Sequence, residues 1–317
     1  MAAMTPQFDR FAKFVATLGR GPGRGRALSR EEAREAFGMV LRQEADPHQI
    51  GAFLMLLRYR GEDAPEIAGM VEAARETIGW QGSRIDLDWP SYGAGRTRGA
   101  PWFLLSALAL ARAGAAVLMH GSNEYSAGVS VEAGLQAIGT DVTGFTYVTL
   151  ASLSPIMNDL LQMRRLFGLR SPVNTVARLL NPGDALASVD GVFHPPYLAV
   201  HLGVAELLAR HRLFVLKGGG GEAERVPLKS ASGWLWDETS GRSEIELPPR
   251  EGLSPLSPAS DTPELLAAVW RNEIAPPTAV ATVIATIGLG LLALGWATTA
   301  EAAERDAERI WQARLPA

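Results

Sequence analysis

The sequence has no cysteine among its 317 residues. Disulfide bonds, thiolate nucleophiles and zinc sites built on cysteine are therefore excluded. Histidine is also scarce, and the five histidines are scattered without the spacing of metal ligands. The formal net charge of -4 at pH 7 shows no excess of positive charge. A strongly basic protein is therefore excluded, although a local basic patch can exist on an acidic chain.

Long hydrophobic runs are rare as well. The first ten residues are polar and no apolar run follows them, so we expect no secretory signal and a cytoplasmic protein. One segment, 279–297, is long and apolar enough to suggest a membrane span. It consists largely of alanine, glycine and threonine and follows two prolines, so we predict a buried core helix and no membrane association.

The length suits one large domain or two unequal ones. The first eighty residues carry apolar residues at helical spacing and helix-start signals at Ser29 and at Asp46-Pro47. The apolar period changes after Gly82. We therefore predict a small helical domain over residues 1–80 and a larger α/β domain over 81–317. Residues 153–182 are expected to pack on the helical domain or to form the hinge.

One stretch, 85–126, organises the second domain. Residues 85–89 alternate weakly, 101–114 are apolar at helical spacing, and 115–119 form a short apolar run. This order predicts a strand–helix–strand unit with two loops, 91–98 and 119–123. In a parallel sheet both loops leave the carboxyl edge, where open α/β folds bind ligands.

A second strand-then-glycine layout follows later in the chain. Residues 213–216 predict a strand that runs into Lys217 and four consecutive glycines. Glycine amides after a strand can bind an anion, or the run can be only a tight turn.

The order and spacing of these motifs resemble anthranilate phosphoribosyltransferase and its glycosyltransferase family 3 relatives, over nearly the whole chain. Residues 53–62 and 66–69 look like helices of that family's helical domain. Ser91 to Gly95 stands where the family has a Gly-Thr-Gly-Gly-Asp pyrophosphate loop. Met119 to Ser122 stands where it has Lys-His-Gly-Asn. The remaining matches are Arg164, Arg170, Asn174, Asn181, Pro182, His194, Pro195, Lys217 and Gly218.

The resemblance implies a fold and an assembly. The family has a small helical domain and a larger α/β domain with a mainly parallel sheet, which nucleoside phosphorylase II shares. It also implies a homodimer that forms through the helical domain.

The departures from the family pattern concern charged and polar positions. Gly95 replaces the loop aspartate, Met119 the phosphate-binding lysine, and Ser122 the asparagine beside it. Of the Asp-Glu pair that holds magnesium, only Glu224 is present, since Ala223 takes the other position. Polar residues after the loop have become Pro101, Phe103 and Leu104. Each charged hydrogen bond contributes about 1.5–3 kcal/mol, so ordinary donor binding is not expected.

Other substitutions add positive charge. Arg96 and Arg98 are new in the first loop, and with other cations they can form a cationic rim at one edge of the sheet. Tyr92 and Trp102 lie beside them as possible stacking surfaces, a combination that suits single-stranded nucleic acid. In the alternative, Trp102 is a core residue, and Arg164 and Arg170 cap helices or bridge the two domains. The other cations of the rim are His120, Arg164, Arg165, Arg170, Lys217 and Arg225.

The resulting hypothesis is an atypical family member that is similar to the YbiB-type branch, whose members are implicated in nucleic-acid binding. The rivals are an active glycosyl or phosphoribosyl transferase with an altered donor, for which magnesium would be needed, and a nucleoside phosphorylase. We expect Arg164, Arg165, Arg170, Lys217 and Arg225 on the acceptor or polyanion side and Glu224 at a weak metal position. The expected donor or anion loop comprises Ser91, Tyr92, Gly93, Gly95, Arg96, Arg98, His120, Gly121 and Ser122.

Overall fold

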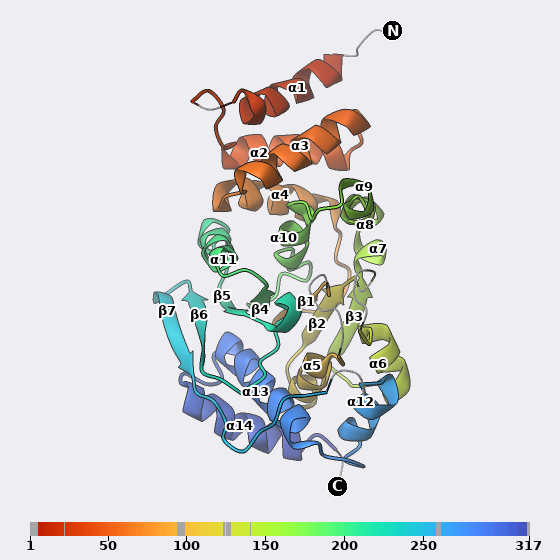
Figure 1. Cartoon of the computed structure of the whole chain (residues 1–317), viewed down its shortest axis with the longest axis vertical. Coiled ribbons are helices and arrows are strands. Elements are labelled where there is room, and N and C mark those ends of the chain that lie inside the picture. Colours follow the sequence, from red (N-terminus) through yellow and green to blue (C-terminus); the bar gives the residue numbers. More distant parts are fainter. Residues whose placement is uncertain are drawn as a thin grey trace. The chain divides into compact units, whose positions relative to one another are not determined.

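The structure is a computed structural model that describes residues 6–21, 23–93, 99–122, 124, 128–139, 141–257 and 261–315. The chain divides into two compact units. A helical unit comprises 1–81 and 150–182, and an α/β unit comprises 82–149 and 183–317. The chain therefore leaves the α/β unit after residue 149 and returns to it at 183 (Figure 1).

The helical unit begins its helices with side-chain caps. Ser29, Asp46 and Asp63 each form a capping box with the residue three positions later, as the sequence signals at the first two positions predicted. Helices α2 and α4 touch closely, because a Cβ at Gly69 would lie only 2.0 Å from the carbonyl oxygen of Arg30. The helices are α1 (Pro6–Gly19), α2 (Arg30–Leu41), α3 (Pro47–Arg60), α4 (Ala64–Thr77), α7 (Leu150–Leu153), α8 (Pro155–Gln162), α9 (Arg164–Phe167) and α10 (Val173–Arg178).

The α/β unit is built on one mixed sheet in the order β3-β2-β1-β4-β5-β6-β7. Neighbouring strands are parallel from β3 to β5, and β6 and β7 extend the sheet as an antiparallel hairpin. The predicted fold class, a helical domain and a larger α/β domain with a mainly parallel sheet, is confirmed. The strands are β1 (Leu87–Ser91), β2 (Val117–Gly121), β3 (Phe145–Thr149), β4 (Ala187–Val192), β5 (Arg212–Lys217), β6 (Ala231–Asp237) and β7 (Gly241–Leu247).

Helices cover both faces of this sheet. On one face α5 and α13 pack together over the central strands, and α14 packs on α13 (Figure 1). On the other face α11 packs against β5 and β6. The helices are α5 (Trp102–Arg112), α6 (Val131–Ile138), α11 (Pro196–Leu207), α12 (Pro263–Trp270), α13 (Pro277–Leu294) and α14 (Ala300–Gln312), and Gly219–Gly221 form the 3-10 turn η1.

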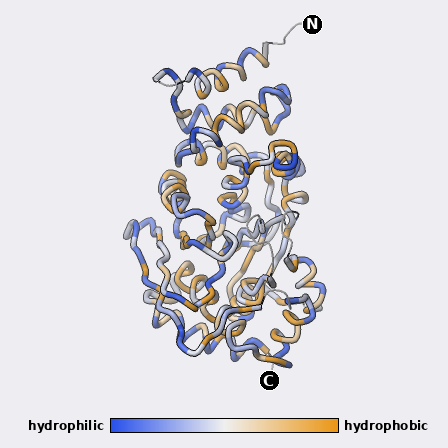
Figure 2. The backbone as a smooth tube through the Cα atoms, in the orientation of Figure 1, coloured by the Kyte–Doolittle hydropathy of each residue, from blue (hydrophilic) through white to orange (hydrophobic). Residues whose placement is uncertain are grey.

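Helix α13 is the apolar segment that resembled a membrane span. It is long and apolar enough to cross a bilayer by length and composition alone (Figure 2). However, 83% of its apolar window is buried, and its side chains belong to the same hydrophobic core as α5 and the sheet. The predicted core helix is therefore confirmed.

Candidate functional site

The two predicted loops begin at the same edge of the sheet. Strands β1 and β2 are parallel neighbours, and their last residues, Ser91 and Gly121, are paired. Strands β4 and β5 end at the paired residues Val192 and Lys217. The carboxyl ends of these four strands therefore form one edge, as the strand–helix–strand pattern predicted.

A glycine lets the first two strand ends approach closely. A Cβ at Gly121 would lie 1.7 Å from the carbonyl oxygen of Ser91, so no other residue fits there without movement. The amide of Ser122 donates a hydrogen bond to the same oxygen at 3.1 Å. The backbone of both loops is thus fixed where they leave the sheet.

A buried polar chain lies directly behind these loops. The Tyr92 hydroxyl lies 2.8 Å from Nδ1 of His120, and the two rings pack edge to face. Nε2 of His120 lies 3.3 Å from Oδ1 of Asp88, and neither atom makes a hydrogen bond within the described residues. All three side chains are at most 1% exposed. The arrangement can orient the Tyr92 hydroxyl, but it does not reach solvent.

This burial corrects three sequence-based expectations. Tyr92 and Trp102 are 1% and 2% exposed, so they are not stacking surfaces; Trp102 is a core residue, as the alternative interpretation held. His120 is a fully buried strand residue and does not belong to an exposed cationic rim. Their position next to a strand end suggested that these three side chains are exposed to solvent. The sheet and the layers that cover it enclose them instead.

The glycine-rich segment after β5 reaches the first loop. Oε1 of Glu222 accepts a hydrogen bond from the amide of Gly93 at 2.5 Å. Oε2 of Glu224 accepts one from the amide of Phe103, in the first turn of α5, at 3.0 Å. Both glutamates are buried. The segment therefore contacts both the entry and the exit of the loop between β1 and α5.

These contacts bear on the expected metal position. Glu224 uses one carboxylate oxygen for the α5 amide, and its neighbour Ala223 has no ligand atom in its side chain. Within the described residues no group of three or more His, Asp or Glu side chains could hold a metal ion. Of the Asp-Glu pair expected at a magnesium site of the family type, only Glu224 supplies a carboxylate here, because Ala223 takes the other position.

The predicted cations are in three different situations. Arg225 is buried, its guanidinium donates to the carbonyl oxygen of Pro248, and burial lowers the pKa of the guanidinium from its ordinary value. Its place in an exposed rim was therefore wrong. Lys217 is exposed at the end of β5. The first loop's expected residues Gly95, Arg96 and Arg98 lie outside the described residues. The helical unit contains the remaining cations, Arg164, Arg165 and Arg170.

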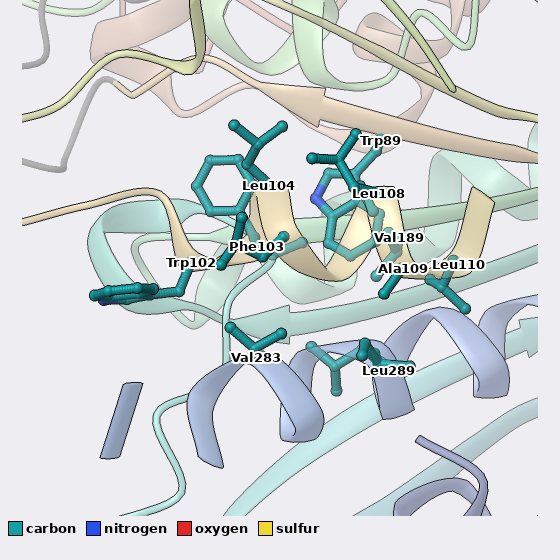
Figure 3. Close-up of a cluster of buried hydrophobic side chains, with 14 of the residues drawn as sticks. Trp89, Trp102, Phe103, Leu104, Leu108, Ala109, Leu110, Val189, Val283 and Leu289 are labelled. Atoms are coloured by element: carbon teal, nitrogen blue, oxygen red, sulfur yellow. The ribbon is translucent and has the colours of Figure 1, made fainter. Parts of the chain in front are cut away.

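The substituted positions of the first loop and helix lie in the hydrophobic core. Met119, Phe103 and Leu104 are each 0% exposed. They belong to one cluster with side chains of the sheet, α5 and α13, and Figure 3 shows Phe103 and Leu104 among these core residues. The N-cap of α5, Pro101, makes no side-chain capping hydrogen bond. These positions therefore present apolar side chains inward and no polar side chain to the loop.

Two features of the site were missed from the sequence. Phe193, directly after β4, is 43% exposed and packs edge to face with His194, with ring centroids 4.7 Å apart. Asp190 of β4 and His201 of α11 form a buried pair, with 2.7 Å between Oδ2 and Nδ1. Recognising 187–192 as a strand would have indicated Phe193, since it follows the strand end as Tyr92 does.

Known proteins resemble this chain in sequence and in fold. Residues 15–78 match the family model described as "Glycosyl transferase family, helical bundle domain". The anthranilate phosphoribosyltransferase of Mesorhizobium japonicum is 30% identical over 210 residues, which cover 62% of each protein. The chain spans about 62 to 65% of the length of the curated relatives that it matches first.

Solved structures extend the likeness to nearly the whole chain. Anthranilate phosphoribosyltransferase from Thermus thermophilus has a TM-score of 0.77 at 26% identity, covering 96% of this chain and 95% of that one. The enzyme from Saccharomyces cerevisiae, solved in complex with PRPP and Mg, has a TM-score of 0.77 at 15% identity, covering 96% and 94%. At that identity the likeness to the yeast protein concerns the fold alone.

Proposed function

We propose that the chain is an atypical anthranilate phosphoribosyltransferase-like protein of glycosyltransferase family 3, and that it binds nucleic acid or another polyanion. In this proposal the site where relatives hold phosphoribosyl pyrophosphate is degenerate. The YbiB-type branch, a homodimer and a cytoplasmic location are parts of the same proposal.

The burial of Met119, Phe103 and Leu104 in the core is the observation that carries the proposal. A lysine or a hydroxyl at these positions would neutralise or hydrogen-bond the phosphates of a donor. Each such contact with a charged group contributes about 1.5–3 kcal/mol, and the apolar side chains present make none of them. The loss of several contacts weakens donor binding by orders of magnitude.

The metal position supports the same conclusion. Phosphoribosyl pyrophosphate carries several negative charges, and the yeast relative was solved with PRPP and Mg together. Here Ala223 supplies no carboxylate and Glu224 is hydrogen-bonded to the amide of Phe103. The local charge that would neutralise a diphosphate is therefore reduced as well.

Polyanion binding is supported by the exposed cation Lys217, the exposed ring of Phe193 and several arginines. Lys217 ends β5 opposite Val192, the residue before Phe193, and the amide of Gly218 donates to the Val192 oxygen at 3.1 Å. A cation and an exposed ring at neighbouring strand ends suit a phosphate and a stacked base of single-stranded nucleic acid. Arg96 and Arg98 add positive charge to the loop after β1 in the sequence, and Arg164, Arg165 and Arg170 add it to the helical unit.

Titration of the wild-type protein with a labelled single-stranded oligonucleotide, followed by fluorescence anisotropy at several salt concentrations, tests this function. We expect binding that weakens steeply with salt. The double variant Arg96→Ala/Arg98→Ala should flatten the slope of log K against log salt by about 1.4, if each arginine contacts one phosphate. Phe193→Ala should weaken binding through lost stacking, worth about 1–3 kcal/mol per base, and leave the slope unchanged.

The matched control is Arg271→Ala/Arg309→Ala, which removes the same charge from two exposed arginines on other parts of the α/β unit. It should leave both affinity and slope close to the wild-type values. Absence of binding at low salt would exclude the nucleic-acid proposal. An equal loss in the control variant would show that only net charge matters.

A further inference from the structure

A cavity of the α/β unit lies at the edge of the sheet where the parallel strands begin. Arg112, the last residue of α5, lines it, and β2 begins five residues later at Val117. Trp296 also lines it, and a Cβ on the preceding Gly295 would lie 3.2 Å from the guanidinium carbon of Arg212, the first residue of β5. The cavity has a volume of about 420 Å³, which is within the range of small-molecule sites.

The lining of this cavity is mainly apolar. Leu291 of α13 is 1% exposed and belongs to the main hydrophobic core, and Ile310 of α14 packs against that core. The Trp296 side chain, by contrast, is 47% exposed. An exposed indole beside an apolar surface offers a ring on which a second aromatic ring can stack. The apolar part of a ligand is therefore expected to be aromatic.

One positive charge in the lining is left for a ligand. Arg309 and Asp306 of α14 both line the cavity and form an ion pair with each other. Arg112 is exposed, and its side chain makes no ion pair or hydrogen bond within the part of the chain that the structure describes. A guanidinium can donate two parallel hydrogen bonds to a carboxylate. The charge of Arg112 therefore matches a ligand with one negative charge.

The helix ends near the cavity have cations of their own. The C-terminal end of a helix carries partial negative charge, which would repel an anion. Nε of Arg212 donates to the carbonyl oxygen of Ala293 at the end of α13, at 2.9 Å. Nη1 of Arg314 donates to that of Trp311 near the end of α14, at 2.7 Å. These contacts offset the negative ends of both helices and leave Arg112 available.

We propose that this cavity binds an aromatic monocarboxylate, whose ring stacks on Trp296 and whose carboxylate pairs with Arg112. An organic cation is disfavoured, because Asp306 is already paired and Arg112 would repel it. A phosphate is also matched poorly, since it carries close to two negative charges. The site is independent of the proposed polyanion function, which concerns the opposite edge of the sheet.

Titration of the wild-type protein with 2-naphthoate, followed through the ¹⁵N resonances of the indole N–H groups, tests the proposal. The Trp296 resonance is the one that disappears in Trp296→Ala. We expect 2-naphthoate to shift it, with a Kd of about 0.1–1 mM for a ligand of this size. The neutral analogue 2-naphthamide should bind about five-fold more weakly, because it cannot form an ion pair with Arg112.

Three variants, titrated by calorimetry, separate the two contacts. Arg112→Gln removes the charge; it should weaken 2-naphthoate binding about five-fold and leave 2-naphthamide binding unchanged. Trp296→Ala should weaken the binding of both probes about ten-fold, because stacking and apolar contact are lost. The matched control Arg305→Gln removes one exposed charge of α14 outside the cavity lining and should change neither affinity.

Equal wild-type affinity for the two probes would overturn the proposal, and so would an Arg112→Gln variant that keeps the wild-type affinity for 2-naphthoate. The absence of any shift of the Trp296 resonance up to about 5 mM 2-naphthoate would also contradict it. A wild-type dimer that Trp296→Ala converts into a monomer in sedimentation would overturn it as well, because a second copy of the chain then occupies the cavity.

Discussion

Replacing Met119 by lysine should lower the free energy of unfolding by about 3–6 kcal/mol, although lysine is the residue that the family carries here. The Met119 side chain is 0% exposed and is packed with residues such as Trp89 in the main hydrophobic core. An ammonium group in that position is desolvated among the apolar side chains of this core. Urea denaturation at neutral pH measures the effect.

The same variant has a defined pH dependence. Burial lowers the pKa of a lysine, to about 5–6 when it is fully buried, whereas the unfolded chain keeps a value of about 10.4. Between these values the unfolded state binds more protons, so the stability of the variant relative to the wild type should rise as pH rises towards 10. The cost is therefore greatest at low pH.

Met119→Leu is the control for this prediction. It keeps an apolar side chain of similar volume and should cost less than about 1.5 kcal/mol. If the lysine variant is as stable as the leucine variant, position 119 opens onto the loop and not into the core. In that case the substitution has not removed a phosphate contact from the fold, and the main observation behind the proposed function is lost.

Replacing His201 by leucine should lower the free energy of unfolding by about 3–5 kcal/mol, because it leaves the carboxylate of Asp190 buried without its partner. Oδ2 of Asp190 lies 2.7 Å from Nδ1 of His201, and Oδ1 has no hydrogen-bond partner within the described residues. Thermal or urea unfolding measures the loss. The double variant Asp190→Leu/His201→Leu should recover part of it, since no buried charge is then left.

The chain offers an exposed pair of the same type as the control. Nδ1 of His211 lies 2.6 Å from Oε1 of Glu238, and the two side chains are 55% and 48% exposed. His211→Leu should cost less than about 1 kcal/mol, because water solvates the remaining carboxylate. Equal costs for His201→Leu and His211→Leu would contradict the argument from burial.

The architecture around the site was largely predictable from local pattern. The apolar helix between two short strands predicted the unit that became β1, α5 and β2, and its two loops do leave the same sheet edge. Capping residues such as Ser29 located helix starts, because their side chains bond to amides only three positions away. Such signals are short-range, so a single sequence contains them.

Strand β4 shows why part of the sheet was not predictable. Its residues Ser188 and Asp190 interrupt the apolar pattern expected of a buried parallel strand. Asp190 is tolerated there because His201 of α11 lies opposite it. The polar residues within this strand are therefore explained only by the position of α11 on the sheet. Because the strand was not predicted, the exposed Phe193 that follows it was not predicted either.

The contact that defines the site was also beyond local pattern. Gly93 and Glu222 are 129 positions apart, and no local pattern distinguishes Glu222 from the nearby Glu224. Exposure was misjudged for Tyr92 and Arg225 because residue type indicates solvent only on average. Burial at a sheet edge depends on which segments return to cover it.

The most direct test of the central claim is calorimetric titration of the wild-type protein with phosphoribosyl pyrophosphate in the presence and absence of magnesium. We expect no saturable heat of binding up to about 1 mM ligand, with or without the metal. Saturable, magnesium-dependent heat at micromolar ligand would contradict it and would favour an active transferase that uses other residues for its donor.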